Sequence, residues 1–466
     1  MAGKKKNGLL LLILCTVLAG FVILYFLLPQ KKEEGAADTG ETKSITVDEI
    51  DSAAVSSLVV EKKGKETYSL VKKKDDWQFS DKSKIPLDAD TVSGLFGCLS
   101  PVTASQEVRT GTDTDLAQYG LDQPAMTIRV TTSDGKEHQY MLGDPVPAIG
   151  GYYGMTSSDD TVYCFAEELY STFDIGKNSL IRIEELPQID SACMTRLKID
   201  NRKGSDFEAT VGKDGETWKI TKPYARALTA SGSEWETAKG YFTALAYDRI
   251  QEYQSGELEQ YGLKTPSSVI TVRYYEAKKK SGDTKESENT EDTGEIAEKD
   301  RVYRTLQLYI GKSCEDGYYV CEKGSSNVYI MAGDTVENMT GLDAYEVMDQ
   351  NIYNGEAADL KGYEVSFGGK KISVKKEEYD TYETPFLTAQ QLTYSGKADP
   401  SVRPEGTKPV LTMVYHEQKK DVTVKYLPYD GTNFYLVDKD GMDYFLADKP
   451  GVDDLVRQFR EADKED

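Results

Sequence analysis

Few residues in the sequence are suited to acid–base or nucleophilic chemistry. The chain has two histidines, His138 and His416, and each lies in a polar, hairpin-like stretch, GKEHQY or VYHEQK. A Ser-His-Asp or Cys-His site would need partners from distant parts of the chain, so we interpret both as exposed histidines on strands. The 79 acidic residues make chance carboxylate pairs common, so their presence is no basis for inferring a glycosidase-type acid pair. The sequence therefore predicts no catalytic residues and no enzyme.

One acidic segment, DKDGMD from Asp438 to Asp443, partly matches a calcium-binding loop. Met442 occupies a position where an EF-hand needs an oxygen ligand, and no Glu follows at the twelfth position. An Asp-Gly hairpin turn is therefore the better interpretation. The chain also contains no G-x-G-x-x-G, Walker or G-x-S-x-G motif. We expect no metal site, no cofactor and no nucleotide hydrolysis.

The cysteines that follow the N-terminal segment are an odd and sparse set, which does not make a disulfide framework. They are Cys98, Cys164, Cys193, Cys314 and Cys321. Cys314 and Cys321 flank EDGYYV and could face each other across a hairpin. We interpret them instead as buried thiols that behave as small hydrophobic groups, although the sequence leaves their pairing open. No C-x-x-C motif is present, so neither a zinc ribbon nor a thioredoxin-type site is predicted.

Length and charge limit the class of protein. A chain of 466 residues exceeds what one hydrophobic core supports, because single cores stop growing near roughly 250 to 300 residues. We therefore expect two or three domains. The formal net charge of −23 gives a surface that repels phosphate groups. This argues against nucleic-acid binding and against adhesion to anionic lipid headgroups.

The N-terminal segment contains an uncharged apolar run from Gly8 to Leu28 (residues 8–28). This is about the length that a helix needs to cross a bilayer core of roughly 30 Å. No A-x-A cleavage pattern follows the run, so we expect a retained single-pass anchor in the cell membrane. Lipidation at Cys15 is the alternative, but Leu14 stands where a small residue would be expected. Lys4–Lys6 outweigh the basic residues after the run, which predicts a cytoplasmic N-terminus and an extracytoplasmic location for the bulk of the chain.

A repeated phrase organises the rest of the sequence. LAQYGLDQP at Leu116–Pro124 recurs as LEQYGLKTP at Leu258–Pro266. Upstream, an IDSA segment and a tryptophan recur at nearly the same spacing, and downstream so do Gly-Tyr-Tyr and Val-Tyr. We therefore infer a duplicated module of about 140 residues. The second copy carries an additional polar segment, Ala277–Arg301, which we interpret as a flexible insertion at a hairpin tip.

The phrase itself encodes the end of a short helix. Gly120 suits the left-handed position after the helix, Leu116 and Leu121 form the apolar pair of a Schellman motif, and a following proline prevents the helix from resuming. Acidic residues before Leu116 supply the N-cap. The second copy contains the same set. We interpret Tyr119 and its counterpart Tyr261 as aromatic residues packed behind the cap rather than as hydroxyl ligands.

The sequence around this helix end predicts many strands, for example SSLVVEKKG, TYSLVKKK and the hairpin MTIRVTTSDGKEHQYML. PLDADTVSGLFGCLS and SGSEWETAKGYFTAL have apolar residues at helical spacing. The predicted class is α+β: tandem antiparallel-sheet modules, each with one longer and one short capped helix, behind a single N-terminal transmembrane helix. The predicted parts are a cytoplasmic tip and transmembrane helix at 1–30, a linker at 31–44, module 1 at 45–185, module 2 at 186–350 with the insertion 277–301, and a degenerate, partial third module at 351–466 that ends in a helix at Gly451–Arg460.

The order W…(helix)…YGLxxP…(hairpin)…IG…GYYV resembles the bacterial family catalogued as domain of unknown function 4340. The resemblance covers most of Ile45–Asp349. It rests on Trp77, Tyr119, Gly120, Leu121, Pro124, Gly143, Tyr152 and Tyr153 in the first copy, and on Trp218, Tyr261, Gly262, Leu263, Pro266, Ile310, Gly311, Tyr318 and Tyr319 in the second. The resemblance implies no reaction and no catalytic residue. It implies a likeness to accessory components found beside ABC-type exporter permeases and to gliding-motility-type auxiliary proteins.

These observations favour a non-catalytic, membrane-anchored, extracytoplasmic accessory or scaffold protein. Its expected partners are membrane proteins, an ABC-type permease or an auxiliary subunit of an export or gliding-motility-like system. One alternative is a surface module that binds cell-wall glycan or peptide, for which the 31 tyrosines could offer stacking faces. Another is an uncharacterised hydrolase, which would need a deep pocket with converging polar groups. The sequence does not specify the partner, any transported substrate or the oligomeric state.

Overall fold

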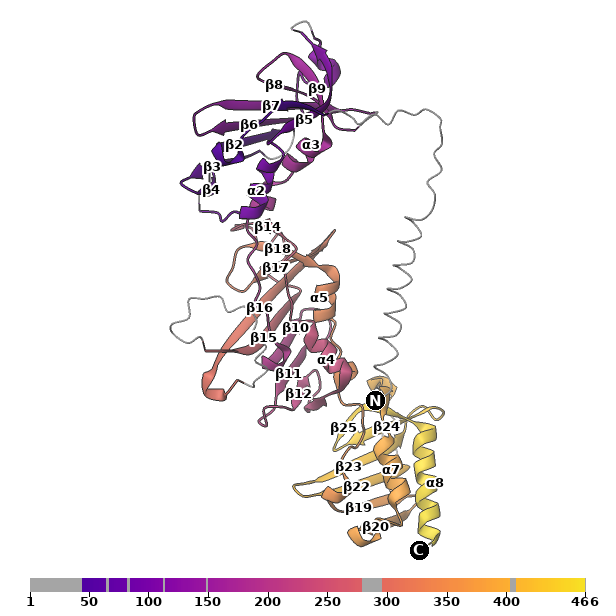
Figure 1. Cartoon of the computed structure of the whole chain (residues 1–466). Helices are drawn as coiled ribbons and strands as arrows, with labels where there is room; N and C mark the ends of the chain where they lie inside the picture. Colours follow the sequence, from indigo (N-terminus) through magenta and orange to yellow (C-terminus); the bar gives the residue numbers. More distant parts are fainter. Residues whose placement is uncertain are drawn as a thin grey trace, which may run out of the picture. The chain divides into compact units, whose positions relative to one another are not determined.

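The computed structural model describes residues 44–465, apart from 64–66, 82–83, 112–113, 148–149, 279–295 and 403–407. The described chain forms two compact units. The first contains the residues up to Thr67 together with Leu95–Asp174, and the second contains Tyr68–Gly94 and the residues from Ile175 onward. Both units are built mainly from antiparallel β-sheet, with few helices (Figure 1). The predicted sheet-rich character is confirmed.

Three sheets contain the strands. The first has the order β1-β5-β9-β8-β7-β6-β2-β3-β4 and consists of β1 (Ile45–Asp48), β2 (Val55–Lys62), β3 (Tyr68–Lys73), β4 (Asp76–Phe79), β5 (Val102–Thr110), β6 (Met126–Thr132), β7 (Glu137–Pro145), β8 (Tyr152–Thr156) and β9 (Thr161–Phe165). The second has the order β13-β12-β11-β10-β15-β16-β17-β18-β14 and consists of β10 (Met194–Asn201), β11 (Phe207–Val211), β12 (Trp218–Lys222), β13 (Leu228–Ala230), β14 (Arg249–Glu252), β15 (Ser268–Ala277), β16 (Arg301–Cys314), β17 (Gly317–Glu322) and β18 (Val328–Ala332). The third has the order β20-β19-β22-β23-β24-β25-β21 and consists of β19 (Leu360–Phe367), β20 (Lys370–Lys375), β21 (Tyr394–Lys397), β22 (Leu411–Glu417), β23 (Asp421–Pro428), β24 (Phe434–Lys439) and β25 (Met442–Asp448).

One strand order recurs in all three sheets. The run β3-β2-β6-β7-β8-β9-β5 corresponds to β11-β10-β15-β16-β17-β18-β14 and to β20-β19-β22-β23-β24-β25-β21. In each case the first long strand of the module pairs antiparallel with a strand much further along the chain, as in β2 with β6, β10 with β15 and β19 with β22. The third sheet thus contains every strand of the shared order, although its sequence lacks the repeated phrase.

The hairpin of β6 and β7 shows how the sequence produces these strands. Along β6 the side chains of Met126, Ile128 and Val130 are fully buried, and they alternate with partly exposed residues. This alternation is the period of two that a half-buried strand requires. Gly135 has a φ of 87° in the turn that joins the two strands, so the predicted Asp-Gly hairpin is confirmed.

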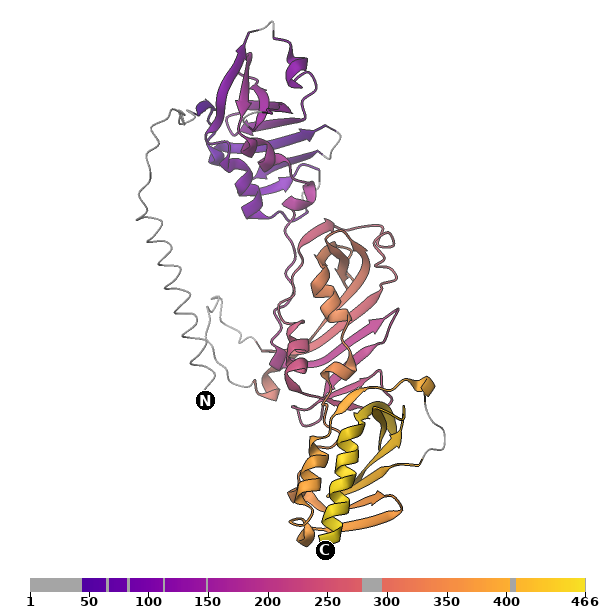
Figure 2. The same ribbon diagram turned by 90° about the vertical axis from the view of Figure 1, so that its right-hand side faces the viewer.

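Helices occupy two recurring positions in the modules. The position before the last strand of the shared order, which is β5, β14 or β21, holds α2 (Ala89–Gly97), α4 (Gly232–Gly240) and α7 (Glu383–Gln391). The position after the last hairpin holds α3 (Glu167–Phe173), α5 (Gly333–Thr340) and α8 (Lys449–Glu465), and α6 (Ala344–Val347) follows α5. The two helices predicted from apolar spacing are confirmed as α2 and α4, and Leu95 and Trp235 are buried at 2% exposure in both cases. Helices α7 and α8 lie together on one face of the third sheet (Figure 2).

Two details differ from the sequence-based expectation. The short capped helix is one 3₁₀ turn at Leu116–Tyr119, and in the second copy residues 258–261 form hydrogen-bonded turns. Four residues before a left-handed glycine leave no room for a series of α-helical hydrogen bonds. Helices α3 and α5 were not predicted, because seven and eight residues show too little periodicity. The C-terminal helix is confirmed and extends beyond Gly451–Arg460 at both ends.

Two predicted segments fall largely outside the described residues. The expected transmembrane helix at residues 8–28 is one of them, as is most of the linker that follows it. Among the residues that the structure describes, no helix is both long enough and apolar enough to cross a bilayer. The other is the insertion 277–301, whose central residues 279–295 are not described. Its ends do pair, since Ala277 lies opposite Arg301, so the insertion connects β15 and β16 at the end of their hairpin.

Candidate functional site

The repeated phrase forms the predicted helix end, which we call the joint. Gly120 has the left-handed conformation, with a φ of 69°, and Gly262 has a φ of 74°. The amide of Leu121 donates to the carbonyl of Leu116 at 3.0 Å, and the amide of Gly120 donates to that of Ala117 at 3.2 Å. These are the two hydrogen bonds of a Schellman motif. The leucines of the second copy repeat the longer-range bond at 2.9 Å, so the predicted stop is confirmed in both copies.

Matched apolar clusters enclose the two joints. The first contains Leu121, Met155 and Val162 with Val108, Leu116, Tyr119, Met141 and Tyr153, and the second contains Leu263, Cys321 and Val328 with Leu258, Tyr261, Tyr309 and Tyr319. The ring of Tyr119 packs edge-on against Tyr153 at 5.0 Å, and Tyr261 packs in the same way against Tyr319 at 4.8 Å. Both tyrosines of the phrase are packed aromatic residues, as predicted. Tyr261 also makes the hydroxyl contact that the prediction disfavoured, because its hydroxyl donates to Glu252 at 2.9 Å.

In each copy a further glycine lies in close contact with the backbone of the phrase. A Cβ atom on Gly143 would lie 2.2 Å from the carbonyl oxygen of Tyr119, and one on Gly311 would lie 2.2 Å from that of Tyr261. Any side chain at either position would overlap the backbone of the phrase, so only glycine allows this approach. Many of the residues on which the family resemblance rests thus have one shared role, which is to dock the phrase on the sheet.

His138 is buried at 7% exposure on β7, so the prediction of an exposed histidine is wrong for this residue. Its Nδ1 atom lies 2.6 Å from Oδ2 of Asp48, and the hydroxyl of Tyr140 donates to the same oxygen at 2.8 Å. Burial by itself would raise the pKa of Asp48. Hydrogen bonds from His138, from Tyr140 and from the amide of Glu49 outweigh that effect and hold the pKa below its usual value.

The Asp48–His138 pair could orient an imidazole for proton transfer, but its burial leaves little access for a substrate. Its evident effect is to fasten β1 to β7. His416 is half-buried, with Nδ1 3.1 Å from Oδ1 of Asp421, so it is not freely exposed either. The sequence gives no sign of the first pair, because its two members are far apart in the chain and meet only when the sheet forms.

The five cysteines of the described chain are free, and of the two interpreted as buried thiols, Cys321 is buried and Cys314 is partly exposed. In the hairpin of β16 and β17, Cys321 lies opposite Tyr309 and Cys314 lies opposite Gly317, so the two thiols do not face each other. Burial raises the pKa of Cys321 to about 11, and burial likewise raises the pKa of Cys98 to about 11. Such thiols are poor nucleophiles near neutral pH.

The segment DKDGMD forms the predicted hairpin turn between β24 and β25. Asp440 and Gly441 have φ values of 54° and 82°, and two successive left-handed residues are typical of a type I′ turn. The amide of Gly441 donates to Oδ1 of Asp438 at 2.7 Å. Within the described ranges, no group of three His, Cys, Asp or Glu side chains is placed to hold a metal ion.

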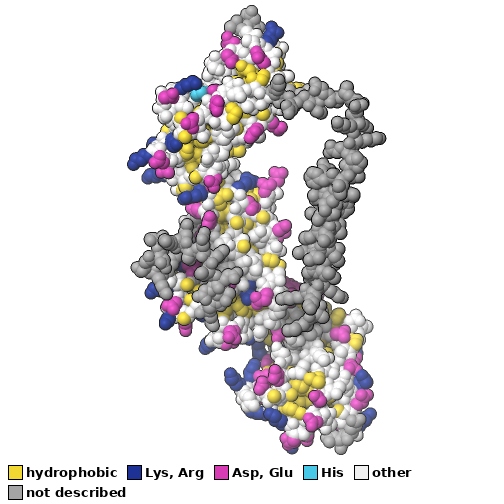
Figure 3. Space-filling model, in the orientation of Figure 1, with side chains coloured by type: hydrophobic (Ala, Val, Ile, Leu, Met, Phe, Trp, Pro, Cys, Tyr) yellow, Lys and Arg dark blue, Asp and Glu magenta, His cyan; other side chains and the backbone are white. Residues whose placement is uncertain are grey.

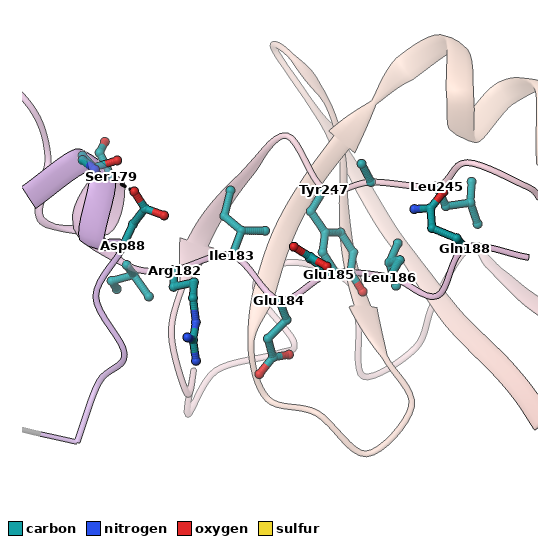
Figure 4. A pocket seen from close by; sticks show the side chains of 13 residues that line it. Asp88, Ser179, Arg182, Ile183, Glu184, Glu185, Leu186, Gln188, Leu245 and Tyr247 are labelled. Carbon is teal, nitrogen blue, oxygen red and sulfur yellow. Dashed lines mark hydrogen bonds between the residues drawn. The ribbon is translucent and has the colours of Figure 1, made fainter. Parts of the chain in front are cut away.

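The candidate site is an open cavity of about 890 Å³ in the second unit, which we call the linker groove. Figure 4 shows its lining along the extended segment that follows Ser179. The lining residues are Asp88, Thr91, Ser179, Ile181, Arg182, Ile183, Glu184, Glu185, Leu186, Gln188, Leu245, Ala246 and Tyr247. They come from three separate segments, the start of α2, the segment after Ser179, and the residues just before β14. No single stretch of sequence could therefore reveal the groove.

Main-chain hydrogen bonds fix one end of the linker groove. The amide of Asp88 donates to the carbonyl of Leu180 at 2.9 Å, and the amide of Arg182 donates to that of Pro86 at 3.0 Å. The Asp88 carboxylate accepts a bond from the amide of Thr91 at 2.8 Å and so caps α2. Hydrogen bonding with Thr91, aided by the charge of Arg182, lowers the pKa of Asp88. This carboxylate is therefore ionised at neutral pH and has a structural role.

Tyr247 bounds the other end of the linker groove. Its ring is 7% exposed and stacks on Tyr329, with centroids 4.0 Å apart and planes within 8°. Its hydroxyl is buried and has no hydrogen-bond partner in the described part of the chain. The side-chain amide of Asn327 donates to Glu184 at 3.2 Å. This bond positions one of the acidic residues of the segment that follows Ser179. Burial raises the pKa of the Tyr247 phenol, so it stays protonated at neutral pH.

The lining of the linker groove is suited to binding. It contains no histidine, cysteine or lysine, and the carboxylate beside its threonine, that of Asp88, is engaged in capping α2. Buried Leu186 and Leu245 provide apolar surface, while Arg182, Glu184 and Glu185 are exposed. Apolar surface with charged groups of both signs at its edge is what a polypeptide segment requires of a binding surface.

The strand order shared by the three sheets defines a class of protein, a tandem array of antiparallel-sheet modules. The model of the family described as Domain of unknown function (DUF4340) matches the chain twice, at residues 77–246 and 218–412. The chain therefore belongs to the DUF4340 family and carries its domain in duplicate. Both matches begin at a tryptophan of the repeat, Trp77 or Trp218. No curated protein and no solved structure gave a match.

Proposed function

We propose that this protein is a non-catalytic, membrane-anchored, extracytoplasmic accessory protein that serves as a scaffold for membrane partners. Within this proposal it is an auxiliary component of an ABC-type export or gliding-motility-like system, and its partner is a permease or an auxiliary subunit. The apolar run at residues 8–28 supports the anchor, because its length suits a bilayer core.

The observation that carries the proposal is the common role of the repeated residues. The phrase at Leu116–Pro124 and its second copy lie in matched clusters and dock on matched glycines. Repeated modules stacked in one chain typically present extended surfaces for partners, while their shared residues maintain the fold. A duplicated module whose shared residues are structural therefore favours a scaffold over an enzyme.

The linker groove supplies a surface for such a partner. A cavity of about 890 Å³ is larger than one side chain requires, and it is open along an extended segment. Acidic and basic side chains are interspersed on the face that Figure 3 displays, so local charge pairs rather than one large patch would set partner choice there.

Photo-crosslinking in intact membranes tests this function. A benzophenone amino acid at Ala246, an exposed residue of the linker groove, should capture a permease subunit or its auxiliary subunit. The matched control carries the same amino acid at Thr432, an exposed position in the loop between β23 and β24, and should capture much less. Deletion of residues 1–30 should abolish the capture, because the chain would no longer be held at the membrane. Failure to recover any transporter component from either position would contradict the proposal.

A further inference from the structure

A second cavity lies within the module of the third sheet, away from the linker groove. It has a volume of about 260 Å³ and is bounded by the aromatic rings of Tyr363, Tyr379 and Phe386 and by the acidic residues Glu356, Asp380 and Glu383. We call it the aromatic cavity. All of these residues belong to the segment around β19, β20 and α7, and nothing in the proposed scaffold function depends on them.

The rings of the aromatic cavity are loosely arranged. Tyr363 is almost fully buried, and its ring centroid lies 5.3 Å from that of Phe386 and 5.9 Å from that of Tyr379. Tyr379 and Phe386 are parallel within 12°, yet their centroids are 6.5 Å apart. Three parallel tyrosine pairs elsewhere in the described chain have centroids 3.6 to 4.0 Å apart. The two rings therefore do not cover each other closely, and ring surface is left to border the cavity.

The charged groups around the aromatic cavity are all acidic. Glu356, Asp380 and Glu383 are exposed, and no hydrogen bond or ion pair in the described structure involves their carboxylates. The lining contains no lysine, arginine or histidine. The amide group of Gln390 already donates to the carbonyl of Gly355 at 2.7 Å. Unpaired acceptors therefore surround the rings, with no protein cation to neutralise them.

The basic side chains near the aromatic cavity make contacts with other groups. The ammonium of Lys376 donates to the carbonyl of Ala358 at 3.1 Å. Arg460 and Lys449, on the nearby α8, lie over the rings of Phe367 and Tyr435, which do not line the cavity. An electron-rich ring face attracts a cation, and adjacent carboxylates add to that attraction. A cation that enters the cavity would therefore meet ring surface and carboxylates that no lysine, arginine or histidine of the lining engages.

We propose that the aromatic cavity binds an alkylammonium group, supplied by the lysine side chain of a peptide. The volume admits one side chain rather than a large ligand. Leu387, at 47% exposure on its rim, would contact the apolar stem, while the partly exposed ring of Tyr379 and the carboxylates receive the charged head. A neutral sugar can also stack on tyrosine, but it would leave three carboxylates without a counter-charge. The lysine peptide is therefore the favoured occupant.

Ligand-observed NMR titration of the full-length protein tests this site. The probe is acetyl-Gly-Lys-Gly-amide, and the matched control is acetyl-Gly-norleucine-Gly-amide, which keeps the apolar stem and lacks the charge. Binding of the lysine peptide should be about tenfold or more tighter, and should weaken as salt rises from about 0.05 to about 0.5 M. Equal binding of the two peptides would overturn the proposal. So would tighter binding of an N-acetylglucosamine oligomer, which would assign the cavity to glycan instead.

Variants connect the binding to the cavity. Asp380→Asn and Glu383→Gln keep the shape of exposed side chains, and each should weaken the lysine peptide about two- to fivefold. Tyr379→Leu should weaken it by a similar factor or more, because a ring face is lost. Glu461→Gln on α8 removes an exposed carboxylate that does not line the cavity and should have no effect. Unchanged affinity in Asp380→Asn, Glu383→Gln and Tyr379→Leu would place the peptide elsewhere and refute the site, whether or not the scaffold function holds.

Discussion

The amide of Lys312 donates a hydrogen bond to the carbonyl oxygen of Tyr261 at 2.9 Å, so β16 is joined directly to the second copy of the repeated phrase. This bond is possible because the preceding residue is Gly311, where a Cβ atom would lie 2.2 Å from the same oxygen. The first copy has the same close approach between Gly143 and Tyr119. The phrase is therefore held by its backbone, which explains why a glycine recurs at a distance from it in the sequence.

Gly311→Ala should destabilise the second sheet by about 1–3 kcal/mol, because the added methyl group must displace backbone. Denaturant unfolding measures the loss, and hydrogen exchange at residues 258–263 localises it. Gly94→Ala is the matched control, since a Cβ at this position in α2 meets nothing within 4 Å. Alanine there should be neutral or stabilise the helix by up to about 1 kcal/mol. Equal losses in the two variants would show that the close approach is unimportant.

Leu121→Ala and Leu263→Ala should each cost about 2–5 kcal/mol, because both side chains are buried, at 4% and 1% exposure, in the matched clusters. The two losses should be similar, since the clusters are built alike. Denaturant unfolding followed by tyrosine fluorescence is the measurement. Val402→Ala, at 44% exposure, should change stability by less than about 0.5 kcal/mol. A large loss in only one copy would contradict the equivalence of the joints.

Stability of the first unit should fall in acid because of Asp48. Its pKa is depressed in the folded state by hydrogen bonds from His138 and Tyr140, which outweigh burial. A depressed carboxyl pKa contributes stability above the unfolded value of about 4, and that contribution disappears as pH falls through the folded pKa. The rate of limited proteolysis of the first unit, measured between about pH 3 and about pH 7, reports this loss of stability. Asp48→Asn should be less stable near neutral pH and should lose much of the acid sensitivity of this unit; an unchanged pH profile would rule the pair out as its source.

Cys321 should react very slowly with iodoacetamide. Its pKa of about 11 leaves roughly one thiolate in a thousand at about pH 8, and the side chain is 1% exposed. Mass spectrometry of the alkylated protein measures the rate, and the same reaction in concentrated guanidinium gives the unfolded reference, in which Cys321 should react as fast as an ordinary thiol. Analysis without reductant should show no bond between Cys314 and Cys321. Detection of that disulfide would mean that the hairpin register differs from the one in which Cys321 faces Tyr309.

Local features were predictable where one short stretch of sequence contains all the interacting groups. The Schellman joint at Gly120 needs only residues within one phrase, and the hairpin turns at Gly135 and Gly441 need only two adjacent residues. Helices α2 and α4 were predicted from the helical spacing of their apolar residues alone. Family membership was predictable for the same reason, because its motif is a series of such local phrases.

Features formed by distant segments were not predictable. The contact of His138 with Asp48 joins two different strands, and the lining of the linker groove comes from three segments. The aromatic cavity likewise combines β19 and α7, whose rings show no common pattern in the sequence.

The sequence by itself determined the repeated module, its joints, its strand-rich character and its family, because periodicity and turn chemistry act between near neighbours. Only the tertiary structure decided which strands are adjacent, which histidine is buried and where cavities form. Those outcomes depend on the pairing of strands across long stretches of chain, where the register of a sheet brings together side chains that no local pattern relates.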